Sequence, residues 1–346
     1  MRLVTTTRCQ RHVGARRLRA LVAAGIATAL LAAGVVAEQP LVIRPAASIA
    51  AVHAFVAGDA GELRIVDVAA GAVTDVVDTG APVTGLAVSP DGRTVFVVNG
   101  WSGSIAVVDV ATASILRRIR VKAELDSAVV RPDGQRLYLT GTANGHGVVL
   151  GFDLANDSLA AVIQVGSAPT GIAVSPDGTR LYVINNQGAS VSVIDTRDAS
   201  VAHTVPVDVL PQYVAVSPDG ATTYVSHTSK SADTTGFVTV IDNRTSKVVA
   251  HIPVGVGASE LAVGGERLYV SNLQDGTVSV VDTATRRVLS TLVLATRGIA
   301  FSPRDHSVYL ATGRTATVVD SGTGQVTSTI DLASNRDPAT VIAVTG

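Results

Sequence analysis

The chain has 346 residues, of which 47% are hydrophobic but only 3% aromatic, so its apolar side chains are mostly small or β-branched. Residues 1–37 contain six of the 27 Lys and Arg residues and none of the 28 Asp and Glu residues. The rest of the chain therefore has 21 basic and 28 acidic residues, a net charge of −7. This balance argues against nucleic-acid binding, which needs a basic face. β-Branched residues favour strands, and 32 Gly and 13 Pro supply turns, so the composition favours an all-β fold.

The first 37 residues have the features of an export signal. Residues 1–19 contain six Arg and no acid, residues 20–37 are uninterrupted apolar or small residues, and Val35 and Ala37 suit a signal peptidase. The apolar run of 18 residues is near the lower limit for crossing a bilayer. Residues 1–37 are therefore predicted to be a cleaved signal peptide or, alternatively, a retained membrane anchor. We expect residues 38–48 to be a linker, and the protein to be secreted or located in the cell envelope.

A phrase recurs about every 42 residues. The stretch YVINNQGASVSVID at Tyr182–Asp195 returns as YVSNLQDGTVSVVD at Tyr269–Asp282. An aromatic residue opens a short apolar strand in each unit, at Phe55, Phe96, Tyr138, Tyr182, Tyr224, Tyr269 and Tyr309. An Asp closes a later strand, at Asp67, Asp109, Asp153, Asp195, Asp242, Asp282 and Asp320. Turns such as SPDG, preceded by a short apolar run, stand before most of the aromatic residues. Each unit thus contains four short strands, which is typical of a propeller blade.

Seven such units fit into residues 49–346. The first unit lacks an innermost strand of its own, and the last residues of the chain, Thr340–Val344, supply one with no blade after it. The sequence therefore predicts an all-β, seven-bladed β-propeller of four-stranded antiparallel blades. The C-terminal strand is predicted to complete the first blade and so close the ring.

The repeated phrases Tyr182–Asn185, Tyr269–Asn272 and Phe96–Asn99 resemble the YVTN β-propeller repeat family, and the resemblance covers residues 49–346. That family includes surface-layer and cell-envelope proteins, exported propellers of unclear role, and relatives of seven-bladed lactonases. The d1-haem domains of nitrite reductases are also similar in fold. The resemblance implies no catalytic residues, because the Tyr, Asn, Pro, Asp and Gly of the repeat are structural.

Ligands of propellers usually meet the top face, which carries the loops between second and third strands and between blades. Two of these loops are expected to be expanded: that of blade 5, His227–Gly236, and that of blade 3, which contains His146. Blade 2 offers Trp101. The alternative is loop drift without a ligand. The candidate ligand-binding residues are Trp101, Asp126, His146, Gln212, His227, Lys230 and Arg297.

The residues that begin the innermost strands should surround the mouth of the central channel. They are Thr84, Asp126, Thr170, Gln212, Ser259, Arg297 and Thr340. Asp126 and Arg297 lie nearly opposite each other in this ring, where they could orient a polar ligand. They are also the candidate catalytic residues, with Asp126 as general base and Arg297 polarising a carbonyl. The alternative is two solvated charges lining a water-filled channel.

Other motifs are missing. The sequence has no nucleophile elbow, zinc-protease motif, EF-hand loop or Walker loop. The only cysteine, Cys9, precedes the apolar run, so the rest of the chain can form no disulfide or zinc–thiolate site. His203 and His251 occupy equivalent outer strands and are expected to face solvent. No cofactor, covalent haem or metal is expected.

These observations favour an exported, non-catalytic binding or scaffold module. We expect it to be a monomer that recognises an envelope protein, a glycan or a small polar ligand through its top-face loops. It would contact a membrane only through an uncleaved N-terminal segment. The alternatives are a lactonase-like hydrolase with a polar site at the channel mouth, and a purely structural envelope protein.

Overall fold

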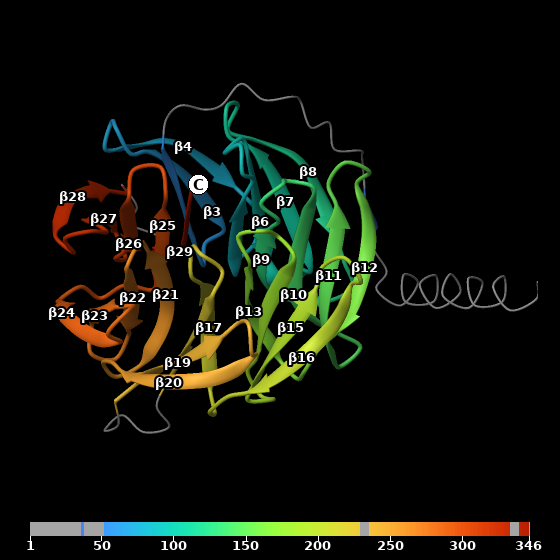
Figure 1. The fold of residues 1–346 in the computed structure, drawn as a ribbon. Coiled ribbons are helices and arrows are strands. Elements are labelled where there is room, and N and C mark those ends of the chain that lie inside the picture. Colours follow the sequence, from blue (N-terminus) through green and yellow to red (C-terminus); the bar gives the residue numbers. More distant parts are fainter. Residues whose placement is uncertain (1–35, 38–51, 229–234, 333–338, 346) are drawn as a thin grey trace, which may run out of the picture.

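The computed structural model describes residues 36–37, 52–228, 235–332 and 339–345. In these parts the chain forms seven antiparallel sheets, which surround a common axis as the blades of a β-propeller (Figure 1). The predicted fold class is therefore confirmed. Apart from one single-turn 3-10 helix, η1 (Gly100–Ser102), the described elements are all strands.

The strands of blades 1 to 4 follow, each blade from its innermost to its outermost strand. They are β29 (Ala339–Val344), β2 (His53–Gly58), β3 (Glu62–Asp67) and β4 (Ala72–Asp78); β5 (Gly85–Val88), β6 (Thr94–Asn99), β7 (Ser104–Asp109) and β8 (Ser114–Arg120); β9 (Glu124–Val130), β10 (Arg136–Ala143), β11 (His146–Asp153) and β12 (Ser158–Gln164); and β13 (Pro169–Val174), β14 (Arg180–Asn185), β15 (Ser190–Asp195) and β16 (Ser200–Pro206).

Blades 5 to 7 have the same order. Their strands are β17 (Pro211–Val216), β18 (Thr222–His227), β19 (Phe237–Asp242) and β20 (Lys247–Pro253); β21 (Ala258–Gly264), β22 (Arg267–Asn272), β23 (Thr277–Asp282) and β24 (Arg287–Leu292); and β25 (Gly298–Ser302), β26 (Ser307–Ala311), β27 (Thr315–Asp320) and β28 (Val326–Asp331). Each innermost strand contacts the innermost strand of the next blade, and β29 contacts β5, so these strands form a closed ring.

The closure of the ring joins the two ends of the propeller. Strand β29 pairs antiparallel with β2, with Val344 opposite Ala54. The backbone N–H of Thr345 donates to His53 O at 3.0 Å, and His53 N–H donates to Thr345 Oγ1 at 3.1 Å. The predicted completion of the first blade by the C-terminal strand is therefore confirmed.

The core is divided among the blade interfaces. Among the described residues, buried hydrophobic side chains form seven clusters, one between each pair of neighbouring blades. The aromatic residues of the repeat lie in these clusters: Tyr182 packs against blade 5, and Tyr309 against blade 1. Small β-branched side chains suit this packing because adjacent sheets approach closely near the axis. No single blade could bury both of its faces alone.

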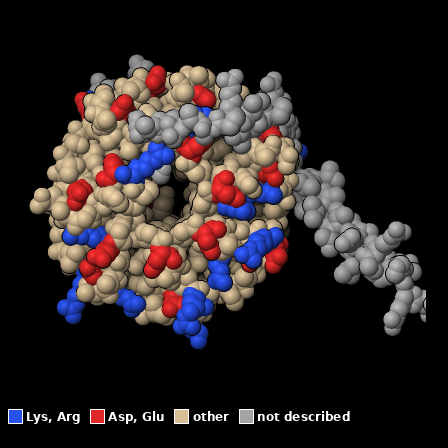
Figure 2. All heavy atoms as spheres, turned by 45° about the horizontal axis from the view of Figure 1, so that its top comes forward, with Lys and Arg blue, Asp and Glu red and all other residues tan. Residues whose placement is uncertain are grey.

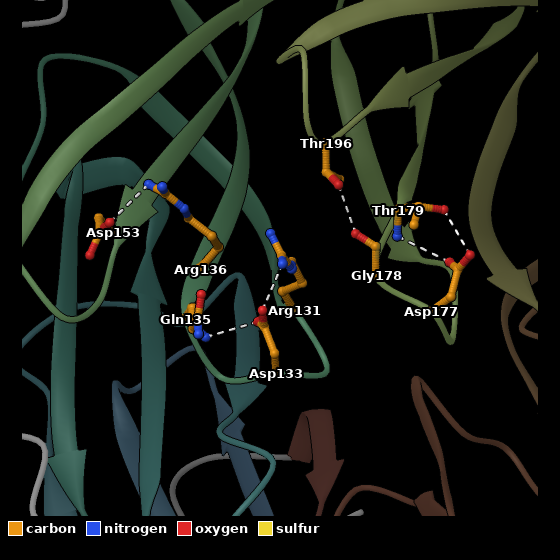
Figure 3. Close-up of polar contacts among 9 residues, drawn as sticks. All are labelled: Arg131, Asp133, Gln135, Arg136, Asp153, Asp177, Gly178, Thr179 and Thr196. Atoms are coloured by element: carbon orange, nitrogen blue, oxygen red, sulfur yellow. Dashed lines mark hydrogen bonds and ion pairs between the residues drawn. The ribbon is translucent and has the colours of Figure 1, made fainter.

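The turns of the repeat are held by local hydrogen bonds. In blade 4, Ser175 Oγ donates to Asp177 Oδ1 at 2.5 Å, Arg180 N–H donates to Ser175 Oγ, and Gly178 takes a positive φ of 70°. Figure 3 shows this turn, in which Thr179 also donates to Asp177, beside the corresponding turn of blade 3 around Asp133. These Asp and Gly residues are therefore structural.

At the N-terminal side, two residues form a strand β1 (Val36–Ala37) that pairs antiparallel with β8, with Val36 opposite Arg120. Most of the predicted signal or anchor segment, residues 1–35, lies outside the described residues, and its cleavage stays a prediction. No helix in the described part of the chain is long and apolar enough to span a membrane.

Candidate functional site at the channel mouth

A central channel runs between the seven innermost strands. Figure 2 shows its opening on one face of the ring, with acidic and basic side chains interspersed around it. The predicted mouth residues Thr84, Asp126, Thr170, Gln212, Ser259, Arg297 and Thr340 all lie within three residues of the start of an innermost strand. This end of the inner strands belongs to the top face, where the second and third strands of each blade are also connected.

Asp126 of β9 is half-buried in this ring. Among the described residues, its carboxylate takes part in no hydrogen bond or ion pair, and burial raises its pKa to about 6. Arg297 directly precedes β25 and is exposed, and the described residues show no ion pair between the two. The structure thus places both predicted residues at the mouth without joining them. Their catalytic roles stay predictions.

Two further side chains, Tyr213 and Glu260, lie one residue further along the inner strands of blades 5 and 6. Glu260 accepts a hydrogen bond from Ile299 N–H in β25 at 2.8 Å, and burial raises its pKa to about 8. The pKa of Tyr213 is raised well above its usual value, first by the charge of Glu260, then by burial and then by Asp126. The phenol therefore lies within electrostatic reach of both carboxyl groups.

Sequence reasoning missed Tyr213 and Glu260, although the repeat contains a signal for them. The equivalent position is glycine in three other blades, at Gly85, Gly171 and Gly298. A tyrosine or a glutamate at a position that is otherwise often glycine is a large change in side-chain size and polarity, and this change is the signal. The side chain of Gln212 forms hydrogen bonds within its own blade. Its N–H groups donate to Leu210 O at 3.2 Å and to Thr228 Oγ1 at 3.4 Å.

Trp101 lies on η1 in the top loop of blade 2 and is 87% exposed. The turn that carries it is clamped against the connection between blades 2 and 3. A Cβ on Gly100 would lie 2.2 Å from Leu125 O, and one on Gly103 would lie 2.5 Å from Val121 O. Gly103 also has a φ of 60°, which favours glycine. The indole is therefore presented to solvent by a turn that has little room to move.

His146 is exposed and is the first residue of β11. The predicted expanded loop of blade 3 is wrong. Strands β10 and β11 each run for eight residues and are joined by Asn144 and Gly145. Both turn residues have positive φ, 52° and 78°, as a tight two-residue hairpin turn requires. The additional residues of this blade therefore lengthen the hairpin rather than a loop.

The prediction that His227 belongs to the top loop of blade 5 is also wrong. His227 is the last residue of β18, fully buried, and its ring stacks on Phe237 with centroids 4.6 Å apart. Its Nδ1 lies 3.2 Å from Val209 O and its Nε2 lies 2.9 Å from Thr239 Oγ1. Both ring nitrogens thus have protein partners. Lys230 lies outside the described residues.

The described residues contain no group of three or more His, Cys, Asp and Glu side chains that could hold a metal ion. His203 and His251 are both exposed, as the outer-strand positions predict. His251 Nδ1 lies 3.2 Å from Thr239 Oγ1 and 3.6 Å from the carboxylate of Asp208.

The opposite face carries shallow grooves between blades. The groove between blades 4 and 5 has a volume of about 340 Å³ and is lined by Asp177, Arg180 and Arg244 among others. Grooves of about 350 and 380 Å³ lie at the next two interfaces, where equivalent turn residues line them. Because they recur with the repeat, they reflect blade packing.

No family model matches the chain, and no curated protein matches it. Solved structures with the same fold include the Kuenenia stuttgartiensis hydrazine synthase, at 24% identity and a TM-score of 0.60 over 75% of this chain and 86% of that chain. Another is the dihydro-heme d1 dehydrogenase NirN in complex with DHE, at 14% identity and a TM-score of 0.64 over 89% of this chain and 79% of that chain. At these identities the likeness shows the propeller fold alone.

Proposed function

We propose that this seven-bladed β-propeller is a non-catalytic recognition module that acts outside the cytoplasm or in the cell envelope. Its top face would bind a protein or a glycan, with Trp101 as the anchor. The observation that carries the proposal is the 87% exposure of this indole on a clamped turn. The basic and apolar segment in residues 1–37 supports the proposed location.

Exposed aromatic side chains on rigid supports are effective binding anchors. Tryptophan is enriched among the residues that dominate binding energy, and its contact area is large while few of its torsions must be ordered. Two charged residues lie on the segment that packs beside η1: Lys122, in the connection to blade 3, and Glu124, the first residue of β9, are exposed, and β9 contacts η1. A planar apolar anchor with charged neighbours suits a sugar ring or a peptide with polar groups.

The experiment is a binding screen of the full chain against glycan and peptide arrays. Trp101→Ala is compared with wild type and with Leu289→Ala, which removes an exposed apolar side chain, 53% accessible, from the outer strand β24. We expect Trp101→Ala to lose the retained ligand by about tenfold or more. Ligands that all bind Trp101→Ala as tightly as wild type would refute the top-face anchor.

A hydrolase is the second candidate, and the observation that favours it is the position of Asp126. A carboxyl group whose pKa is raised to about 6 can act as a general base near neutral pH. The test is activity on a panel of lactones, compared among wild type, Asp126→Asn and Arg297→Ala. Turnover by wild type that both variants retain would remove the proposed roles. If neither turnover nor a retained ligand is found, a purely structural envelope role is favoured.

A further inference from the structure

Blade 2 contains a strand that the repeat does not provide. Its sheet has five strands, whereas each of the other six sheets has four strands among the described residues. The additional strand is β1 (Val36–Ala37), which pairs antiparallel with the outermost strand β8. Val36 lies opposite Arg120, and Ala37 lies opposite Ile119. This pairing joins the N-terminal segment to the outer edge of the propeller.

The strand β8 presents this edge from a fixed position. On its inner side it pairs with β7. Arg118 Nη1 donates to the backbone oxygen of Thr79, on the blade 1 side, at 2.6 Å. Arg117 forms a buried ion pair with Asp157 in blade 3. An edge that is already ordered loses little conformational entropy when another strand pairs with it.

The backbone N–H of Arg120 points outward, towards β1. The next N–H along the chain, that of Val121, donates inward to Gly103 O at 2.8 Å. Successive N–H groups of an extended strand point to opposite sides, so the N–H of Arg120 lies on the outer side of the sheet. This is the side on which Val36 pairs. Arg120 therefore offers a hydrogen-bond donor to an added strand.

Two other blades show how the same edge can be blocked. At the position of Arg120, blades 4 and 5 have Pro206 and Pro253, and all three residues lie opposite the first residue of the third strand. Proline has no N–H and is tolerated on an edge strand where that group would face solvent. These two edges therefore lack the donor that blade 2 retains at the equivalent position.

The paired residues are those that a signal peptidase would have to reach. Val35 and Ala37 suit the peptidase, and the predicted cut lies between Ala37 and Glu38. A segment that is paired with a sheet must open before a protease can bind it, so the cleavage rate falls with the population of the open form. We propose that β8 is the docking edge for the chain's own residues 36–37, and that this pairing shields the bond between Ala37 and Glu38 once the propeller has folded.

The order of folding and cleavage then decides which form of the protein exists. A chain that is cleaved before it folds loses residues 1–37, and β8 is left with an unpaired edge at Ile119 and Arg120. A chain that folds first keeps these residues, including the apolar run that could anchor it. The inference rests on the export signal that supports the proposed location, and it does not involve Trp101.

The test is the rate at which a signal peptidase in detergent micelles cuts the folded full chain, followed by mass spectrometry. Wild type is compared with Arg120→Pro, with Arg120→Ala and with a synthetic peptide of residues 20–45, which contains the same bond without β8. Arg120→Pro removes the outward N–H and is expected to fold, because blades 4 and 5 have proline at this position. Arg120→Ala removes the same side chain but keeps the N–H.

We expect wild type and Arg120→Ala to be cut at least about tenfold more slowly than the peptide, and Arg120→Pro at a rate near that of the peptide. Wild type that is cut as fast as the peptide would overturn the proposal, and so would Arg120→Pro that is cut as slowly as wild type. A peptide that is not cut would overturn the predicted export signal, and the proposal with it.

A second measurement tests the pairing without a protease. In a Cys9→Ser background, Val36→Cys with Arg120→Cys should form a disulfide, because directly opposite residues have Cα atoms within disulfide range. Val36→Cys with Leu116→Cys is the control, because Leu116 is exposed and lies about 13 Å further along β8. This control pair should stay reduced. If the first pair fails to cross-link, the pairing and the proposal are both wrong.

Discussion

His227 of β18 and Thr239 of β19 are joined by a hydrogen bond of 2.9 Å between Nε2 and Oγ1. The other ring nitrogen, Nδ1, faces Val209 O, which can only accept, so Nδ1 carries the proton and Nε2 accepts from the threonine hydroxyl. Blade 4 uses Asn185 at the same place in the repeat, where it donates to Ser192 Oγ at 2.9 Å. His227 thus takes over the structural role of the repeat asparagine in blade 5.

This relationship predicts acid sensitivity. Burial lowers the pKa of His227 below its usual value of about 6.5 in the unfolded chain. Between these two values the unfolded state binds a proton that the folded state does not, so stability is lost as pH falls below about 6.5. Asp208 and His251 are the titratable groups that act on His227. Denaturant unfolding of wild type and His227→Asn at pH 5 and pH 8 should show a smaller acid loss in the variant. An equal loss in both proteins would contradict the assignment.

A second prediction concerns Glu260 and has the opposite sign. Its pKa rises from 4.5 to about 8 on folding, so the folded state binds the proton more tightly. The resulting stability is present below pH 4.5 and is lost as pH rises towards 8, by at most about 1.4 kcal/mol for each pH unit. Glu260→Gln should remove this loss, so its melting temperature should exceed that of wild type at pH 9. A lower melting temperature at pH 9 would mean that ionised Glu260 stabilises the fold.

A third prediction follows from ring closure. Deleting residues 339–346 removes β29 and leaves the inner edge of β2 without a partner. It also removes Val344 and Ile342 from the interface between blades 7 and 1. We expect the shortened chain to melt at least about 10 °C lower or to lose cooperative unfolding, because several kcal/mol of packing and pairing are lost. Equal melting temperatures for the shortened and full chains would contradict the closure.

A fourth prediction concerns the buried ion pair between Arg117 of β8 and Asp157 in the neighbouring blade. Burial lowers the pKa of Arg117 and raises that of Asp157, so each charge depends on the other for compensation. Asp157→Asn, which suits the positive φ of 52° there, should leave the guanidinium unpaired and cost about 3 kcal/mol. Denaturant unfolding measures the loss. The exposed acid variant Glu266→Gln should change stability by less than about 0.5 kcal/mol.

The fold could be predicted from the sequence because the same pattern of strands and turns recurs in seven units. Aromatic residues, turns and terminal Asp residues define strand order, and the unmatched strand at Thr340–Val344 defines closure. The loops were harder to interpret, because a longer unit can lengthen a hairpin as well as a loop. In blade 3 the two-residue turn Asn144–Gly145 joins the strands directly, so the additional residues lengthen the hairpin.

The candidate site was only partly predictable for a related reason. Positions in the mouth ring follow from register, so Asp126 and Arg297 could be placed at the channel. Burial does not follow from register, and it is burial that distinguishes Glu260 and His227 from solvated side chains. His227 looked like the first residue of a loop because the repeat gave no hint that histidine can replace the structural asparagine.

Trp101 itself provides the most direct test of the proposed top-face recognition, because it is the only tryptophan in the chain. Its emission and its quenching by acrylamide would be recorded for the full chain with each ligand retained from the arrays. We predict that a ligand retained by wild type and lost by Trp101→Ala shields the exposed indole from acrylamide. Arrays that retain no ligand, or retained ligands that leave the quenching unchanged, would contradict it.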